Sequence, residues 1–364
     1  MAKYPLRRLI AGTLLLVLSC SASGQGIAAE RIPVKVMIIS MFGLEGAPWI
    51  AALKPEREVQ VPGLSSDFPT VRCTASGICQ MTTDMGHANA AASMMAVIYS
   101  GQFDLRRTYF LIAGIAGINP QYGTIGTATW ARYLVDVDIA HEIDAREMPR
   151  GWSDGFFGVL TDGQQQKPRF DYRTELFQVD EALLQRALQL SRHAVLEDSP
   201  DVVAYRKFYP GAPAHSPPGV TQCDTASGDT WWGGRQLGVR ATRWTRLLTD
   251  GHGIYCTSQQ EDNATLVALT RGAHAGLTDI RRVAVLRTGS DFDRPYPGQS
   301  TFDSMLAQRS VAGAIHTSTA NLVHAGMPLV KDIVDHWDLW QSGVPEGPHT
   351  HPGSTVAVSP RAAP

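Results

Sequence analysis

The chain has 364 residues, of which 44% are hydrophobic and 18% are charged, a composition that is typical of globular proteins and excludes a wholly disordered chain. A chain of this length can bury a large core, either in one α/β domain or in two ordinary domains. The formal net charge of -2 argues against nucleic acid or an anionic membrane surface as a partner.

The first 29 residues have the pattern of an export signal. Lys3, Arg7 and Arg8 form a basic region, and residues 9–18 form an apolar stretch that is too short to span a bilayer. Ala29 offers a cleavage site, whereas the residues before Cys20 resemble a lipoprotein cleavage box, so a lipid anchor at Cys20 stays open. We therefore expect a signal peptide at 1–29 and an exported protein, periplasmic or secreted. No other stretch reaches eighteen apolar residues, so no transmembrane helix is expected in the mature chain.

Apolar runs of strand length alternate with helical patterns along most of the chain. The predicted strands are 34–40, two short strands within 71–83, 107–114, 127–138, 219–227 and the run that begins at Val283. The predicted helices are one that begins near Pro48, 87–99, 181–192 with Asp180 as its cap, 263–275, and 302–340 with breaks at Gly313 and Pro328.

Two stretches, residues 145–178 and the Pro-rich residues 200–218, are expected to be irregular. The alternation of continuously apolar strands with helices indicates an α/β fold with a mixed, mostly parallel central sheet flanked by helices. We expect one domain over residues 30–342, followed by a disordered tail at 343–364 that is rich in Pro, Gly and Ser.

Four cysteines follow the proposed leader, and they allow three pairings. For an oxidising compartment we favour Cys73–Cys79, which closes a tight loop, together with Cys223–Cys256. Four buried free thiols are the alternative. The spacing of these cysteines fits no zinc pattern, and no metal or other cofactor is expected.

The apolar run that begins at Val283 ends abruptly in Thr288-Gly289-Ser290-Asp291. A buried strand would thus carry a carboxylate at its C-terminal tip, where open α/β sheets bind their ligands. Asp291 is therefore a candidate for the acid that protonates a leaving base. The alternative is that Asp291 caps the N-terminus of a helix.

Two glycine-containing patterns resemble known functional motifs in part. Gly114 and Gly117 do not complete a dinucleotide-binding fingerprint, but they allow either close approach of a ligand or tight packing. Gly151-Trp-Ser153-Asp-Gly155 matches the nucleophile-elbow string of serine hydrolases. A polar stretch with Pro149 precedes it instead of a buried strand, which argues against a nucleophilic Ser153.

Six segments together resemble the purine nucleoside permease family, and the resemblance extends over nearly the whole mature chain. They are residues 38–49, 84–89, 114–120, 126–138, 141–147 and 261–265. That family in turn resembles, more distantly, the nucleoside phosphorylase and methylthioadenosine nucleosidase superfold. Four short matches carry this second resemblance: Gly114-Ile-Ala-Gly-Ile, Ala226-Ser-Gly-Asp229, Gln260-Glu261-Asp-Asn and Arg287-Thr-Gly-Ser290-Asp291.

The resemblance implies a nucleoside-phosphorylase-like fold and a set of site residues. Glu261 would grip the ribose hydroxyls, and Asp291 would face N7 of the purine. The other substrate-binding residues would be Gly86, Gly114, Gly117 and Ser290. Aromatic candidates for stacking on the base are Trp130, Trp231, Trp232 and Phe292. We predict Trp231 as the stacking residue because it closely follows the Ser-Gly-Asp segment. A role in the hydrophobic core is an equally open alternative for Trp231.

One departure from the phosphorylase pattern bears on the reaction. Phosphorylases of this fold carry a phosphate-binding Arg two residues before the glycine that corresponds to Gly114, and Ile112 takes that place here. In the hydrolytic branch a Glu after the first strand activates water, and alignment of 36–45 with that strand and loop places Glu45 there. Alternatively, Glu45 is a carboxylate near a helix N-terminus, where it interacts favourably with the helix dipole.

Two functions follow from these residues. The first is an exported purine nucleosidase that acts on adenosine, guanosine or inosine, by hydrolysis rather than phosphorolysis, with Asp291 as acid and Glu45 as base. The second is a non-catalytic nucleoside-binding component of nucleoside uptake. An oligomer stays open. Three acidic residues predicted at one sheet edge argue against a purely structural role.

Overall fold

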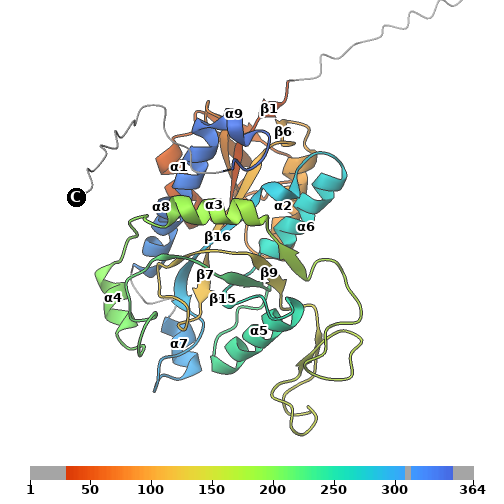
Figure 1. Ribbon diagram of the computed structural model, residues 1–364, viewed down its shortest axis with the longest axis vertical. Coiled ribbons are helices and arrows are strands. Elements are labelled where there is room, and N and C mark those ends of the chain that lie inside the picture. Colours follow the sequence, from red (N-terminus) through yellow and green to blue (C-terminus); the bar gives the residue numbers. More distant parts are fainter. Residues whose placement is uncertain (1–29, 308–312, 347–364) are drawn as a thin grey trace, which may run out of the picture. The chain divides into compact units, whose positions relative to one another are not determined.

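Strand β7 (Tyr109–Ile118) is the strand around which the main sheet is assembled. It pairs in parallel with β2 (Val36–Ser40) and β16 (Val283–Phe292), and antiparallel with β15 (Tyr255–Gln259). The apolar sequences of β7 and β2 suit strands that are buried on both faces. In this computed structural model the described residues are 30–307 and 313–346 (Figure 1). The predicted signal peptide, with Cys20, and residues 347–364 of the predicted tail lie outside them.

The main sheet is mixed and has 12 strands. Its other members are β3 (Arg57–Gln60), β4 (Thr70–Cys73), β5 (Ile78–Thr82), β8 (Ala128–Trp130), β9 (Tyr133–Asp136), β12 (Leu176–Gln178), β13 (Val220–Gln222) and β14 (Asp224–Ser227). Two small sheets pair β1 (Ile32–Pro33) with β6 (Phe103–Asp104) and β10 (His141–Glu142) with β11 (Phe156–Phe157).

Helices flank this sheet in two packed groups (Figure 1). The first group is α1 (Gly43–Leu53), α3 (Glu181–Ser191) and α8 (Ala314–Asp335), and the second is α2 (His87–Tyr99) and α6 (Asp262–His274). The remaining helices are α4 (Pro200–Arg206), α5 (Arg235–Leu248), α7 (Thr301–Ala307), α9 (Trp337–Trp340) and the 3-10 helix η1 (Ile280–Arg282). The predicted α/β architecture with a mixed sheet is confirmed.

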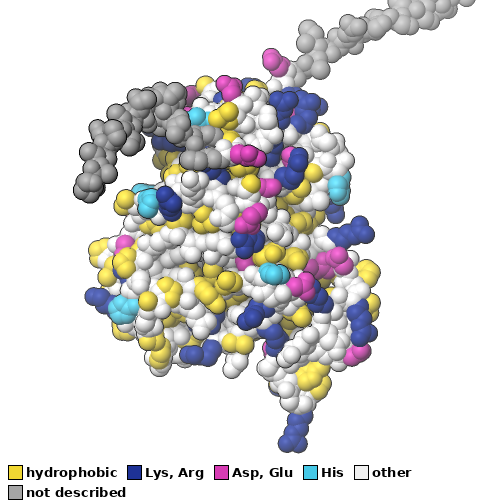
Figure 2. All heavy atoms as spheres, in the orientation of Figure 1, with side chains coloured by type: hydrophobic (Ala, Val, Ile, Leu, Met, Phe, Trp, Pro, Cys, Tyr) yellow, Lys and Arg dark blue, Asp and Glu magenta, His cyan; other side chains and the backbone are white. Residues whose placement is uncertain are grey.

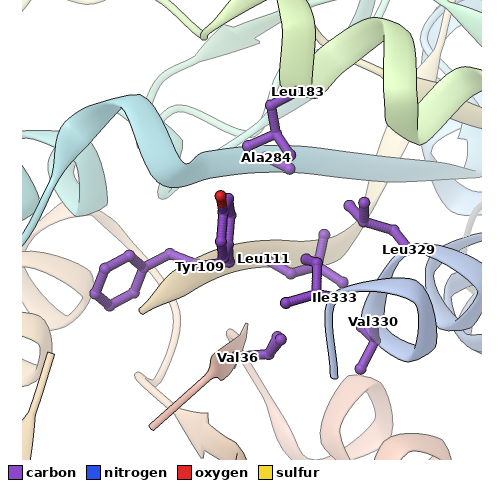
Figure 3. A pocket seen from close by; sticks show the side chains of 9 residues that line it. Val36, Tyr109, Leu111, Leu183, Ala284, Leu329, Val330 and Ile333 are labelled. Atoms are coloured by element: carbon purple, nitrogen blue, oxygen red, sulfur yellow. The ribbon is translucent and has the colours of Figure 1, made fainter. Parts of the chain in front are cut away.

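Helices α3 and α8 cover one part of the sheet through aliphatic contacts. Figure 3 shows Leu183 of α3 and Leu329 and Ile333 of α8 directed towards Val36 and Leu111 in the strands. All of these side chains are buried in the main hydrophobic core. Burying a side chain of this size stabilises the fold by about 1.5–3 kcal/mol, so the apolar face of α8 fixes its position on the sheet.

Local signals predicted several elements correctly. Helix 87–99 has the predicted bounds, and the Asp180 side chain caps α3 by accepting from the N–H of Leu183 at 3.0 Å. The disulfides Cys73–Cys79 and Cys223–Cys256 are also present as predicted. The first joins the ends of β4 and β5, and the second ties the start of β14 to β15.

Proline positions misled two helix predictions. Helix α1 begins at Gly43, not near Pro48, because the N–H groups of Glu45 and Gly46 already bond to the carbonyl of Phe42. Pro328 does not break α8, since buried residues on both sides of it hold the helix on the sheet. Tertiary packing here outweighs the local cost of a proline inside a helix.

Three further differences concern single segments. The predicted strand 127–138 is divided into β8 and β9, and the stretch 200–218 contains helix α4, capped by Ser199. No element was predicted between 228 and 262, where α5 and β15 lie. The buried positions of α5 recur at helical spacing (Gly238, Ala241, Trp244, Thr245, Leu248), whereas β15 buries polar residues and therefore has no apolar run.

Candidate functional site

A cavity opens where five strands of the main sheet end. It encloses about 1050 Å³ of empty space, including its open mouth, and its walls come from the carboxyl ends of β2, β7, β14, β15 and β16 or the segments that follow them. Of these strands, β2, β7 and β16 run parallel, and open α/β sheets bind ligands beyond the carboxyl ends of such strands. Its polar lining includes Glu45, Ser258, Gln259, Glu261, Arg287, Ser290 and Asp291, and its apolar lining includes Met41, Phe42, Met85, Ile115, Trp231, Trp232 and Ile315.

Glu45 reaches the cavity from the first turn of α1. It is 1% exposed, and its two carboxylate oxygens accept from the backbone N–H groups of Met41 and Ile115, each at 2.7 Å. Burial raises the pKa of Glu45 to about 7, with Arg287 opposing the rise and Glu261 adding to it. The position of Glu45 fits both interpretations of this residue. It is an acidic residue in the first turn of α1, near the positive end of the helix dipole, and it also lines the cavity.

Glu261 lies between the end of β15 and the start of α6. It is 4% exposed, and its Oε1 accepts from the backbone N–H of Gly86 at 3.0 Å. Burial raises the pKa of Glu261, while Arg287 lowers it. Gly86 has a φ of +90°, a conformation that disfavours residues with a side chain, and it thereby brings its N–H to the carboxylate.

Arg287 is a buried cation that pairs with Glu261 and Asp262, and the sequence did not predict a role for it. Its guanidinium is 1% exposed and donates to Asp262, to Glu261 at 3.4 Å and to the carbonyl of Ile115 at 2.9 Å. Buried cations are rare unless they are paired. The Arg287-Thr-Gly-Ser-Asp segment contained the signal, because an arginine inside an apolar strand needs buried acidic partners.

Asp291 lies at the end of β16, on the same cavity wall. Its Oδ1 accepts from the Ser290 hydroxyl at 2.8 Å. Burial raises the pKa of Asp291 to about 6; the Ser290 bond lowers it and the neighbouring Asp293 carboxylate raises it. The structure therefore brings Glu45, Glu261 and Asp291 together around one cavity.

The two glycines of β7 differ in their relation to the cavity. Gly117 lines it, and a methyl group there would approach Ser258 Oγ at 2.9 Å. Gly114 does not line the cavity; a methyl group there would lie 2.8 Å from Glu45 Oε1 and 2.5 Å from Arg287 Nη1. Gly114 thus permits the close packing of those two side chains rather than the approach of a ligand.

The aromatic candidates separate into two groups. Trp231 and Trp232 lie shortly after β14 and line the cavity. The Trp231 side chain is 65% exposed. Trp130 is buried and donates to Ser191 Oγ at 2.9 Å, and Phe292 packs against Tyr209. Trp130 and Phe292 are therefore core residues, and the prediction that either could stack on a base was wrong.

The nucleophile-elbow string lies away from the cavity. The Ser153 hydroxyl accepts from Arg243 at 2.6 Å in an exposed loop between β10 and α3.

Within the described ranges, no three His, Cys, Asp or Glu side chains are arranged to hold a metal ion. None of the helices described is long and apolar enough to cross a membrane. On the face in Figure 2, basic and acidic side chains are interspersed.

The chain is similar over most of its length to proteins named purine nucleoside permeases. The model of the family "Purine nucleoside permease (NUP)" matches residues 33–345. A probable purine nucleoside permease of Schizosaccharomyces pombe is 39% identical over 346 residues, which cover 92% of this chain and 99% of the relative. A purine nucleoside permease of Candida albicans is 40% identical over 315 residues, covering 85% of this chain and 77% of the relative.

Solved structures share the fold at low sequence identity. The futalosine hydrolase of Helicobacter pylori has a TM-score of 0.52 and 14% identity, and the match covers 82% of this chain and 98% of that protein. The 5'-methylthioadenosine/S-adenosylhomocysteine nucleosidase of the same organism has a TM-score of 0.51 and 14% identity, with 84% and 99% covered. At this identity the likeness concerns the fold alone.

Proposed function

Since the chain belongs to the purine nucleoside permease family, we propose that its cavity binds a purine nucleoside and hydrolyses the bond between the base and the ribose. The observation that carries this proposal is the convergence of Glu45, Glu261 and Asp291, from three distant segments, on one cavity. The family resemblance found in the sequence is itself confirmed.

Each carboxyl group has a separate role in the proposed reaction. Glu45 takes a proton from water as the water oxygen bonds to C1′ of the ribose. The bond between C1′ and N9 breaks, its electron pair passes to the purine, and Asp291 donates a proton to N7. Glu261 accepts from the 2′- and 3′-hydroxyls, which orients the sugar and supports the positive charge that develops on it.

The raised pKa values suit these roles. An acid with a pKa of about 6 keeps a protonated fraction near neutral pH, and a base with a pKa of about 7 accepts a proton readily there. The Ser290 hydroxyl donates to one oxygen of Asp291, which orients the carboxyl group towards the cavity. One positioned proton donor supplies roughly 10²–10⁴-fold in rate.

Water fits this site better than phosphate as the nucleophile. Ile112, at the position of the phosphate-binding arginine of phosphorylases, is buried in the core. Among the described residues that line the cavity, Arg287 is the one Lys or Arg, and its donors already serve Asp262, Glu261, Gln259 and Ile115. The carboxylates of the wall outnumber this cation, so a phosphate dianion would be repelled.

The test is release of free base by the purified protein from adenosine and inosine, with and without phosphate. We expect release without phosphate. A strict requirement for phosphate would contradict the hydrolytic mechanism. Tight binding of nucleoside without release would instead favour the second candidate, a nucleoside-binding component of uptake, which the family's name supports.

We also propose that the protein is exported. The disulfides Cys73–Cys79 and Cys223–Cys256 support this, because such bonds persist in oxidising compartments. Mass spectrometry of the protein from fractionated cells would give its N-terminus, and recovery of the uncleaved chain from the cytoplasm would refute export. A lipid on Cys20 would add a defined mass.

A further inference from the structure

Two neighbouring N–H groups at the start of α2 donate to two carboxylates from distant parts of the chain. The N–H of Gly86 donates to Glu261 Oε1 at 3.0 Å, and the N–H of His87 donates to Asp229 Oδ1 at 2.8 Å. Glu261 lies 175 residues beyond Gly86, and Asp229 lies 142 residues beyond His87. The first N–H groups of a helix have no partner within the helix and attract negative charge. One helix end therefore holds both side chains.

Asp229 acts as the capping residue of α2. The residue at the N-cap position is Gly86, which has no side chain that could accept from the first turn of the helix. The Asp229 carboxylate supplies that acceptor from the segment after β14. A side-chain oxygen in this role stabilises the first turn of a helix. Asp229 thus fixes the backbone of the residue pair whose other N–H holds Glu261.

The conformation of Gly86 directs the two N–H groups to different acceptors. Its φ is +90° and its ψ is 159°, a combination that favours glycine. A methyl group on Gly86 would lie 3.3 Å from Asp229 Oδ1, so the carboxylate packs directly against this turn. Removal of the carboxylate would release one of the two bonds that hold the turn in place.

The backbone of Asp229 is held independently of its side chain. Its N–H donates to Asp138 Oδ2 at 2.6 Å, and its carbonyl accepts from Gln260 Nε2 at 2.8 Å. Trp231, two residues further along the chain, lines the cavity. Loss of the Asp229 carboxylate leaves both backbone bonds intact, so we expect the Trp231 segment to stay in place and the effect to be confined to the Glu261 side of the cavity.

We propose that Asp229 is a positioning residue for ribose recognition. By holding the start of α2 it keeps the Gly86 N–H on Glu261, and it thereby makes the site prefer ribonucleosides to 2′-deoxyribonucleosides. A carboxylate accepts from two hydroxyls at once only if both of its oxygens face them. The Gly86 N–H holds Oε1 of Glu261, so rotation of an unheld carboxylate would lose one hydroxyl. The inference rests on the proposed function, because it takes Glu261 to bind the 2′- and 3′-hydroxyls.

The expected effect of Asp229 is moderate. Wild-type protein should favour adenosine over 2′-deoxyadenosine by roughly ten- to hundredfold in Kd and in kcat/KM, because the deoxynucleoside lacks one donor to a carboxylate. Asp229→Ala should lower this preference by about fivefold, the typical effect of losing one helix cap. The Asp229 side chain is 56% exposed, which limits the loss. The loss should fall on adenosine, since 2′-deoxyadenosine has no 2′-hydroxyl to lose.

Two further variants separate the hydrogen bond from other roles of Asp229. Asp229→Asn keeps an oxygen that accepts from the His87 N–H, so most of the preference should return. A preference as low as in Asp229→Ala would contradict positioning through this bond. Gly86→Ala moves the N–H itself, because a side chain is disfavoured at a φ of +90°, and it should lower the preference at least as far.

The chain offers a matched control for each kind of change. Asp180→Ala also removes a helix cap, on α3 and outside the cavity. Gly101→Ala also adds a methyl group at a positive φ, of +72°, where no atom lies within 4 Å. Both should lower the melting temperature and leave the preference for adenosine over 2′-deoxyadenosine unchanged. In Asp229→Ala the ratio of adenosine to inosine should stay at its wild-type value, because the Trp231 segment is held by other bonds.

Equilibrium binding and base release with each nucleoside give the outcome. A wild-type preference in Asp229→Ala, or an equal loss in Asp180→Ala, would overturn the inference and leave the proposed function standing. Equal use of adenosine and 2′-deoxyadenosine by wild-type protein would refute the ribose role of Glu261 and the inference with it. Binding of neither nucleoside would overturn the proposed function as a whole. If nucleosides bind without base release, hydrolysis alone is refuted and the ratio of Kd values still decides the inference.

Discussion

The backbone N–H of Ile115 donates to Glu45 Oε1 at 2.7 Å, and this bond joins the first turn of α1 to the central strand 70 residues further along the chain. The other oxygen of Glu45 is held by the N–H of Met41. Because backbone groups hold both oxygens, the carboxylate keeps its orientation before a ligand arrives. Such preorganisation is what makes a polar group effective in catalysis.

Asp291→Asn should reduce kcat for base release by roughly 10²–10⁴-fold, because the amide cannot supply the proton that the leaving purine needs. Nucleoside affinity should change by only a few-fold, since the side chain keeps its shape. Single-turnover base release and equilibrium binding measure the two effects. Asp67→Asn, at an exposed position outside the cavity, is the control; an unchanged kcat in Asp291→Asn would exclude Asp291 as the acid.

The pH dependence of kcat/KM should be bell-shaped with its maximum between pH 6 and pH 7. Asp291 must be protonated, and this form is lost as the pH rises through its pKa of about 6. Glu45 must be ionised, and this form is lost as the pH falls through its pKa of about 7. The competent combination is therefore most populated between the two values.

The residual activity of Asp291→Asn supplies the control for this profile. With the acid removed, kcat/KM should rise through the pKa of Glu45 and then stay level. A wild-type profile that rises steadily to pH 8 would contradict the assignment of Asp291.

Glu45→Gln should gain stability relative to wild type as the pH rises. The pKa of Glu45 is raised by burial to about 7, so folding favours the protonated carboxyl, and this contribution is present at low pH and lost as the pH rises through 7. Glutamine carries no such dependence. Between pH 5 and pH 8 the free energy of unfolding of the variant should rise by about 2–3 kcal/mol relative to wild type. Urea titrations at both pH values measure it, and an equal difference at the two would refute a buried, ionising Glu45.

Gly114→Ala should both destabilise the protein and lower kcat/KM. The added methyl group would lie 2.8 Å from Glu45 Oε1 and 2.5 Å from Arg287 Nη1, so both side chains must move. Inserting a methyl group into such a packed site costs about 1–3 kcal/mol. Gly219→Ala, where no atom lies within 4 Å of the added group, is the control. Wild-type stability and activity in Gly114→Ala would mean that Glu45 and Arg287 are less constrained than the structure indicates.

Trp231→Ala should raise KM about tenfold and leave kcat close to wild type, because an indole at the cavity mouth contributes stacking on the base before the reaction as well as during it. Tyr172→Ala removes a comparably exposed aromatic side chain outside the cavity and should have no effect. A fall in kcat alone would assign Trp231 to the reaction step instead.

The sequence predicted those features whose signals are local. The helix 87–99, the Asp180 cap, the buried strand that begins at Val283 and the Cys73–Cys79 disulfide all depend on neighbouring residues or on short apolar runs, and all are present. The Cys223–Cys256 disulfide, predicted together with it for an oxidising compartment, joins cysteines 33 residues apart and is also present. An apolar run also predicted the carboxylate of Asp291 at the end of its strand, whereas Glu45 and Glu261 were predicted from the family resemblance; all three line the cavity.

Tertiary structure decided what depends on contacts between distant segments. Arg287 found its partners at Asp262 and Glu261, and polar strand β15 found its place beside β7, through contacts that no local pattern records. Helices α1 and α8 continue through Pro48 and Pro328, and in α8 buried residues on both sides of the proline hold the helix on the sheet. The sequence by itself thus determined which polar residues follow apolar strands. Only the folded chain decided which of these residues line the same cavity, because the burial of a charge or a hydroxyl depends on its neighbours in space.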